Sequence, residues 1–226
     1  ELPEIKPIIT EYRRHRLTCR CCGTQTCATL PAGVPQGQTG PRLTAFTGLL
    51  MACFRQSKSR TTLFLEQWLG QPCSTGLTVK LQNLTTKALQ SVYQELCAAL
   101  PRRAVLNIDE TATKEGTAKS WLWTFVAKKF TVFAVRPTRG AVVLDELLTR
   151  KFKRIVGCDR AKMYWQEERL QWCWAHLKRD FQAMADSRHR KAQKVGEQLL
   201  AQTKLLFRQW RRFRDREITR TGLKQT

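Results

Sequence analysis

The sequence predicts an α/β protein in which a helical module precedes a core built on a mixed sheet. Three features of its 226 residues indicate this organisation. Apolar residues recur at helical spacing from Arg42 to about Leu100, whereas beyond Pro101 they form short, strand-like runs. A segment rich in Gly and Pro, residues 31–41, separates the helices from a cysteine-rich start. A hydrophobic content of 42% is enough to bury a core.

The charge balance makes nucleic acid the first partner to consider. Forty Lys and Arg against eighteen Asp and Glu give a net charge of +22. Such an excess creates a positive field that attracts polyanions before any specific contact forms. Ribosomal-type and membrane-surface proteins carry similar charge, but the longest apolar stretch, Leu43 to Phe54, is short and is followed by basic residues. We expect no membrane span, no signal segment and no membrane partner.

Nine cysteines are spread along the chain, and free thiols in a reducing cytoplasm explain them best. Cys19 and Cys22 form a C-x-x-C followed by Gly23, which is the knuckle that zinc ribbons use. This is half of a structural Zn²⁺ site, because such a site needs four ligands. Other ligands would come from residues before Glu1 or from nearby side chains, and ordinary free thiols are the alternative. The nearby candidates are His15, Cys21 and Cys27.

Residues 42–100 are expected to form a small helical DNA-binding module. A helix at 59–69, a Gly-containing turn at 70–76 and a helix starting at about Leu77 are typical of a helix-turn-helix. A packing bundle with a solvated basic face explains the same pattern. If the module binds DNA, five basic side chains would contact phosphates: Arg55, Lys58, Arg60, Lys80 and Lys87.

Beyond Pro101 the apolar period changes from helical to strand-like. The expected elements are strands at 104–108, 121–127 and 130–135, a helix at 140–148, strands at 153–158 and 170–174, and a helix at 175–184. Without the candidate fifth strand at 170–174, the order β-β-β-α-β-α is that of an RNase H-like fold, which combines an antiparallel meander with a parallel crossover. We assign this core to residues 101–185.

A long basic amphipathic helix, from about 192 to 218 within a final segment 186–226, is expected after the core. Its apolar stripe, which we interpret as a packing surface, consists of Val195, Leu199, Leu206, Trp210 and Phe213. The arginines around the stripe would face either DNA or solvent.

Two aspartates are the candidate catalytic residues. Asp109 is expected to close the first strand of the core and Asp159 the fourth, and in this topology those strands lie side by side. A pair of carboxylates is costly unless cations neutralise it. Two Mg²⁺ or Mn²⁺ ions held by aspartate oxygens would activate the attacking hydroxyl and stabilise the leaving oxygen in phosphodiester chemistry. The alternative is that both aspartates are turn formers at strand ends.

The neighbours of these acids are assigned different roles. Glu110 points to the opposite side of its strand from Asp109 and is not an expected co-ligand. Arg160 and Lys162, next to the second acid, are candidates for phosphate contact. His176 is interpreted as a packed, hydrogen-bonded residue, because two-metal chemistry needs no histidine base.

Ordered blocks of the sequence resemble the insertion-sequence-66-type bacterial transposases over essentially the whole chain. Residues 11–23, followed by Leu30 and Pro31, resemble the zinc-ribbon region of that family. Five further blocks resemble its catalytic domain: Asp109-Glu110-Thr111, Ser120 to Trp123, Arg136 to Gly140, Cys158 to Ala161 with Tyr164, and Cys173 to Phe181. The resemblance implies an Asp-Asp-Glu transposase that cuts element ends and joins 3′-hydroxyls to target DNA by metal-assisted transesterification.

The resemblance also implies sites and partners. Asp109 and Asp159 lie where the first and second catalytic acids of the family lie, so both would be catalytic ligands of Mg²⁺ or Mn²⁺. The partner would be double-stranded DNA, at element ends and at the target, with self-association in a synaptic complex in the nucleoid-containing cytoplasm.

Two motifs of the family have no counterpart in the sequence. The first zinc pair would lie before Glu1, and the third acid belongs to an Asn-Asn-x-x-Glu-Arg motif that does not occur before Thr226. We therefore expect a chain truncated at both ends, with residues 1–30 a partial zinc-ribbon-like segment, and inactive alone in strand transfer. The alternatives are a DNA-binding remnant or regulator of transposition without catalytic activity, and an RNase H-like nuclease unrelated to transposition.

Overall fold

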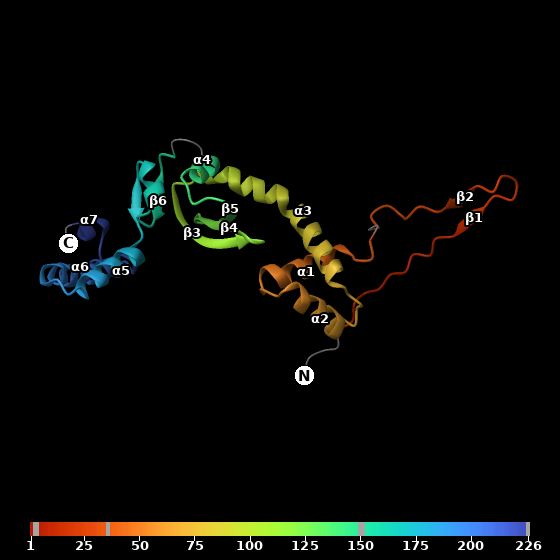
Figure 1. The fold of residues 1–226 in the computed structure, drawn as a ribbon, viewed down its shortest axis with the longest axis horizontal. Coiled ribbons are helices and arrows are strands. Elements are labelled where there is room, and N and C mark those ends of the chain that lie inside the picture. Colours follow the sequence, from red (N-terminus) through yellow and green to blue (C-terminus); the bar gives the residue numbers. More distant parts are fainter. Residues whose placement is uncertain (2–4, 35–36, 149–151, 225–226) are drawn as a thin grey trace. The chain divides into compact units, whose positions relative to one another are not determined.

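A computed structural model describes residues 1, 5–34, 37–148 and 152–224. The chain divides into two compact units, Glu1–Val92 and Tyr93–Thr226, and the border lies inside one long helix (Figure 1). Pro35 and Gln36, in the expected linker, lie outside the described residues. The structure has the mixed α/β composition that the sequence predicted.

The first unit begins with a small hairpin of β1 (Arg16–Thr18) and β2 (Gln25–Cys27), which pair antiparallel. Its turn is closed by two backbone hydrogen bonds. Cys19 N–H donates to the Thr24 carbonyl at 2.9 Å, and Gly23 N–H donates to the Cys19 carbonyl at 2.9 Å. Gly23 has a φ of 70°, which a glycine adopts without steric cost. The hairpin exposes all of its side chains, so it has no core of its own.

Three helices follow: α1 (Pro41–Ala52), α2 (Lys58–Leu69) and α3 (Thr75–Ala99). Ser57 begins α2, because its Oγ accepts a hydrogen bond from the Arg60 N–H at 3.2 Å. Gly70 ends α2 in the left-handed conformation, with a φ of 59°. Ser74 Oγ accepts from the Leu77 N–H at 3.1 Å in the first turn of α3. Local signals therefore explain both ends of the turn between α2 and α3.

The helical module has a core made of small and aliphatic side chains. Its buried residues are Thr47, Leu50, Thr61, Leu65, Cys73, Thr78 and Leu81. A Cβ at Gly48 would lie 2.7 Å from Thr85 Cγ2, so α1 and α3 approach closely at this glycine. Thr85 Oγ1 also donates to the Thr44 carbonyl at 3.2 Å and joins the same two helices.

The second unit contains a five-stranded sheet with the order β5-β4-β3-β6-β7 (Figure 1). Its strands are β3 (Val105–Glu115), β4 (Ala118–Val126), β5 (Thr131–Arg136), β6 (Ile155–Cys158) and β7 (Leu170–Trp172). The first three form an antiparallel meander, whereas β6 runs parallel to β3 and β7 runs parallel to β6. The prediction that the first and fourth strands of this sheet are neighbours is confirmed.

The two faces of the sheet differ sharply in burial. On one face Leu106, Ile108, Trp123 and Phe125 pack into a core with α4 (Val142–Leu148). The short helices η1 (Leu100–Arg102) and η2 (Lys162–Gln166) add Leu100 and Tyr164 to this core. The opposite face leaves a row of apolar residues exposed: Val105, Val126, Phe133 and Val135. Alternation along each strand thus separates a buried face from an accessible one.

The chain continues into α5 (Trp174–Ala185), α6 (Arg190–Arg214) and α7 (Arg220–Lys224). The backbones of α5 and α6 approach closely at Gly196, where a Cβ would lie 2.3 Å from the backbone nitrogen of Ala185. Trp174 meets Phe207 edge to face, with ring centroids 5.5 Å apart. These contacts define the face of α6 that packs on α5.

The expected packing stripe on α6 is wrong at three positions. Val195, Leu206 and Trp210 are more than two fifths exposed, while Gly196 and Thr203 are buried. Small residues let the backbones of α5 and α6 approach closely, and these large apolar residues of α6 therefore lie outside the contact between the two helices. The helix also ends at Arg214, earlier than expected, and Arg216 follows with a φ of 62°.

Candidate functional site

Asp109 lies within β3, so the expectation that it closes this strand is wrong. The antiparallel pairing of β3 with β4 continues past Asp109, opposite Thr124, to Glu115. The parallel pairing of β3 with β6 ends earlier, where Asn107 lies opposite Gly157. Asp109 therefore lies just beyond the last residue of β3 that pairs with β6.

Asp159 follows β6 directly, as predicted, because β6 ends at Cys158. Both aspartates thus lie immediately beyond the parallel ladder that joins the two strands. They line the same pocket, which has a volume of about 360 Å³. The other residues of the pocket are Asn107, Ile108, Thr124, Val126, Gly157, Cys158, Gln171, Trp172, Cys173, Trp174 and His176.

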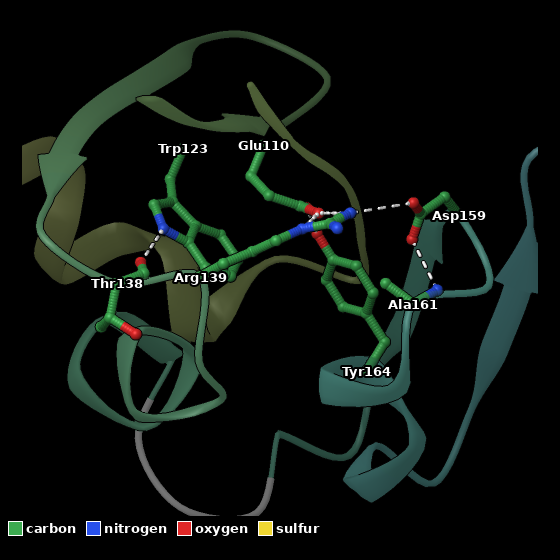
Figure 2. Close-up of polar contacts among 7 residues, drawn as sticks. All are labelled: Glu110, Trp123, Thr138, Arg139, Asp159, Ala161 and Tyr164. Atoms are coloured by element: carbon green, nitrogen blue, oxygen red, sulfur yellow. Dashed lines mark hydrogen bonds and ion pairs between the residues drawn. The ribbon is translucent and has the colours of Figure 1, made fainter. Parts of the chain in front are cut away.

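Both carboxylate oxygens of Asp159 have protein donors. Oδ1 accepts a hydrogen bond from the Ala161 N–H at 2.8 Å, and Oδ2 accepts from Arg139 Nη2 at 3.5 Å. The side chain of Asp159 is 18% exposed. Figure 2 shows Arg139 lying between Asp159 and Glu110, so this arginine connects the candidate acid with a second carboxylate.

Glu110 lies on the buried face of the sheet, opposite to Asp109, as the alternation along β3 predicted. Its side chain is fully buried. Arg139 Nε donates to Glu110 Oε1 at 2.6 Å, and the Tyr164 hydroxyl donates to Oε2 through a short hydrogen bond (Figure 2). Burial raises the pKa of Glu110, and the hydrogen bonds from Tyr164 and Arg139 oppose this rise. A buried acid is thus held by one cation and one hydroxyl.

The surroundings fix Arg139 and Tyr164 in place. The indole of Trp123 donates from Nε1 to the Thr138 carbonyl at 3.1 Å, which anchors the loop just before Arg139. The Arg139 guanidinium also lies over the Trp121 ring, 5.2 Å from its centroid. Burial and the hydrogen bond to Glu110 raise the pKa of Tyr164, so its hydroxyl stays protonated and donates.

Residue-by-residue reasoning from the sequence missed Arg139 and Tyr164 as functional neighbours. Both lie in blocks that carry the family resemblance, and this was the available signal. Cys158, the last residue of β6, is a buried thiol whose pKa is raised by burial to about 12. It is therefore protonated at neutral pH and contributes no charge to the pocket.

The predicted phosphate contacts lie at the surface. Lys162 is exposed, whereas Arg160 Nη2 forms an ion pair with Asp180 of α5 at 2.5 Å. In the helical module, the five predicted DNA contacts are all exposed: Arg55, Lys58, Arg60, Lys80 and Lys87. Exposure keeps these side chains accessible to a polyanion.

His176 is partly buried at the wall of the pocket. Its Nδ1 atom is buried, and no hydrogen-bond partner for it exists among the described residues. The expectation that this histidine is hydrogen-bonded is therefore not met. A buried polar atom without a partner is costly, and the described residues offer nothing that compensates it at His176.

The cysteine-rich turn joins β1 to β2. Cys19 and Cys22 are free and exposed, and the two backbone hydrogen bonds of the turn join Cys19 to Thr24 and to Gly23. The hydrogen bond between Cys22 Sγ and the Thr24 hydroxyl, at 3.1 Å, contributes most to lowering the pKa of this thiol to about 7. In the part of the chain that the structure describes, no group of three or more His, Cys, Asp or Glu side chains is placed to hold a metal ion.

Comparison with known protein families identifies the chain. A sequence model of the family described as "Transposase IS66 family" matches residues 37–225, which is most of the chain. No curated protein matches the sequence. Among the described helices, none has the length and apolar character needed to cross a membrane.

Proposed function

Since the chain belongs to the IS66 family of transposases, and so to enzymes of DNA transposition, we propose that Asp109 and Asp159 are two catalytic acids of an Asp-Asp-Glu centre. This centre would cleave DNA at the ends of an insertion sequence and transfer the strands to a target. The observation that carries the proposal is that both aspartates line one pocket, just beyond the ladder between β3 and β6.

The strand order supports an RNase H-like core. A three-stranded antiparallel meander continues into two parallel strands, and the candidate acids come from the two central neighbours, β3 and β6. Acids from adjacent parallel strands lie at the same edge of the ladder, as phosphodiester chemistry with two metal ions requires. The accessible face of the sheet, which carries Asp109, would receive the DNA backbone.

The donor set fits a divalent metal only in part. The carboxylate oxygens of Asp109 and Asp159 are ligands of the kind that Mg²⁺ and Mn²⁺ prefer. Among the described residues no third His, Cys, Asp or Glu side chain is placed to complete a metal site with them, and Asp159 already accepts hydrogen bonds from Ala161 and Arg139. We propose that this chain by itself catalyses strand transfer at background level. The alternative function is that of a DNA-binding remnant or a regulator of transposition.

Double-stranded DNA is the proposed partner, because exposed basic residues lie on α2, on α3 and just before α2, and the net charge is +22. Self-association in a synaptic complex and a location at the nucleoid are further parts of this proposal. Cys19 and Cys22 would form half of a Zn²⁺ site, since thiolates are the usual zinc ligands and the pKa of Cys22 is lowered to about 7.

Mn²⁺ binding and strand transfer test the proposal together. We expect Mn²⁺, detected by the enhanced relaxation of water protons, to bind weakly to the chain, and Asp109→Asn and Asp159→Asn each to remove that binding. The matched control is Asp186→Asn, because Asp186 is an exposed carboxylate at the end of α5 that is hydrogen-bonded to Gln182. Mn²⁺ binding that survives both substitutions would contradict the assignment of the two acids.

Strand transfer is measured with duplex DNA and Mg²⁺ or Mn²⁺. We expect background levels from the chain by itself. Activity above background that Asp109→Asn abolishes would refute the proposed inactivity and would support the catalytic role of the acid.

A further inference from the structure

The outer side of α3 in the helical module takes no part in the proposed cleavage chemistry. The inner side packs on the module, because Thr78 and Leu81 are buried and Thr85 donates a hydrogen bond to the Thr44 carbonyl of α1. Four exposed residues recur about one helical turn apart on the opposite side, and we call them the outer face of α3: Gly76, Lys80, Asn83 and Lys87.

Packing does not explain two residues of this outer face. The Asn83 side chain forms no hydrogen bond with any described residue, although asparagine is a poor helix former. Glycine is poorer still, yet the φ of Gly76 is not positive, and a Cβ there would lie 3.7 Å from its nearest neighbour, Ser74 Oγ. The fold would accept alanine at both positions, so a binding partner explains these two residues better than packing does.

The charge around the outer face is suited to a polyanion. Residues 41–92 carry six basic side chains and one acidic side chain, Glu66. Lys80 and Lys87 are exposed, and neither forms an ion pair within the part of the chain that the structure describes. Both ammonium groups are therefore available to contact phosphates.

The connection between α2 and α3 determines which of the two helices would read bases. α2 ends at Leu69 with Gly70 in the left-handed conformation, and α3 begins at Thr75, after Ser74 has capped its first turn. In a helix-turn-helix the second helix lies in the major groove, while the first helix crosses the DNA backbone. In this arrangement α3 is the helix that meets the bases.

Building on the proposed binding of double-stranded DNA, we propose that α3 places its outer face in the major groove, where Asn83 reads an adenine. The carboxamide of asparagine accepts a hydrogen bond from N6 of adenine and donates one to N7, and the major groove exposes both atoms. The stretch from Lys80 to Lys87 spans about 10 Å of helix, close to the groove width of about 12 Å, so both lysines reach phosphates. Gly76 lets the first turn of α3 approach the DNA closely.

Selection from a pool of duplexes with a randomised centre tests this inference. We expect the chain to retain a recurring sequence that contains an essential adenine. Fluorescence anisotropy then compares the retained duplex with the same duplex in which G·C replaces that A·T pair. We expect about tenfold weaker binding after the replacement, which corresponds to about 1.4 kcal/mol and lies within the range of one bidentate contact.

Asn83→Ala should bind the two duplexes equally and should unfold at the same or a higher temperature, because alanine is the better helix former. The matched control is Gln67→Ala, which removes an exposed side-chain amide of α2 and should keep the tenfold preference. Gly76→Ala should weaken the binding of both duplexes without lowering the thermal stability, because the module leaves space for its Cβ. A purely structural role of these residues would instead lower thermal stability and binding together.

Selection without a recurring sequence, or an adenine preference that Asn83→Ala keeps or that Gln67→Ala also removes, would overturn the inference. The proposed catalytic role of the acids has a separate readout, because Mn²⁺ binding by Asp109 and Asp159 requires no DNA. Absence of the adenine preference with Mn²⁺ binding retained therefore refutes the reading by α3 alone. Absence of Mn²⁺ binding with the adenine preference retained refutes the metal centre alone.

Discussion

Replacing Arg139 by methionine tests whether this arginine compensates the buried charge of Glu110. A hydrogen bond to a charged group contributes about 1.5–3 kcal/mol, and removing one partner of a buried ion pair costs about 3–5 kcal/mol. The side chain of Arg139 is 43% exposed, and the Tyr164 hydroxyl would still donate to Glu110. Water reaches the pair and reduces the loss. We therefore expect Arg139→Met to destabilise the second unit by about 2 kcal/mol at neutral pH.

The loss should depend on pH in a defined direction. In the wild-type protein burial raises the pKa of Glu110, and Arg139 offsets part of that rise. Removing Arg139 should therefore raise the pKa of Glu110 further. The folded variant then favours the protonated acid. Below the pKa of the unfolded glutamate the acid is protonated in both states, and the loss is small. As the pH rises, the unfolded state ionises more readily than the folded state, and the stability of the variant falls relative to the wild type.

Urea unfolding followed by tryptophan fluorescence at about pH 4 and about pH 8 measures this difference. The matched control is Arg136→Met, since Arg136 pairs with Glu146, whose side chain is 49% exposed, and its loss should stay below about 1 kcal/mol. Combining Arg139→Met with Glu110→Gln should cost less than the sum of the single changes. A loss at Arg139 that is independent of pH, or additive effects in the double variant, would refute the reasoning.

Two further results are expected. The logarithm of the DNA association constant should fall linearly with the logarithm of the salt concentration, with a slope of about −4.5 if all five basic residues of the helical module contact phosphates, and a flat response measured by fluorescence anisotropy would contradict this. Gly196→Ala should lower the thermal stability of the α5–α6 pair by about 1–3 kcal/mol, because its Cβ would lie 2.3 Å from the Ala185 nitrogen. Gly76→Ala in α3, where the nearest atom is 3.7 Å away, should be neutral or stabilising, and equal effects at the two glycines would argue against close packing.

Local sequence patterns predicted the elements of the sheet but not all of their ends. Asp159 was placed correctly because an apolar run stops at Cys158, where β6 also stops. Asp109 follows a similar run, yet β3 continues to Glu115 because β4 supplies a partner for the polar residues beyond it. Strand ends depend on pairing between strands, which the pattern of one segment does not contain.

The contacts of Glu110 are a second feature that the pattern of a single segment does not contain. Alternation in β3 was sufficient to place this acid on the face opposite to Asp109. Its partners lie 29 and 54 residues away in sequence, at Arg139 and Tyr164, and no spacing rule joins such positions. On α6, likewise, Gly196 and Thr203 make the close contacts, so a search for large apolar residues chose the neighbouring face.

Two consecutive acids of β3, Asp109 and Glu110, connect the stability of the core with the geometry of the proposed site. Asp109 lies on the accessible face, and Glu110 is buried on the other face with Arg139 and Tyr164. Arg139 also donates to Asp159, so the guanidinium that compensates the buried acid holds one oxygen of the second candidate acid. Any ligand that draws Asp159 away must therefore leave Arg139 with Glu110 alone. Because Glu110 is fully buried and keeps this partner, the core can tolerate that change without an uncompensated charge.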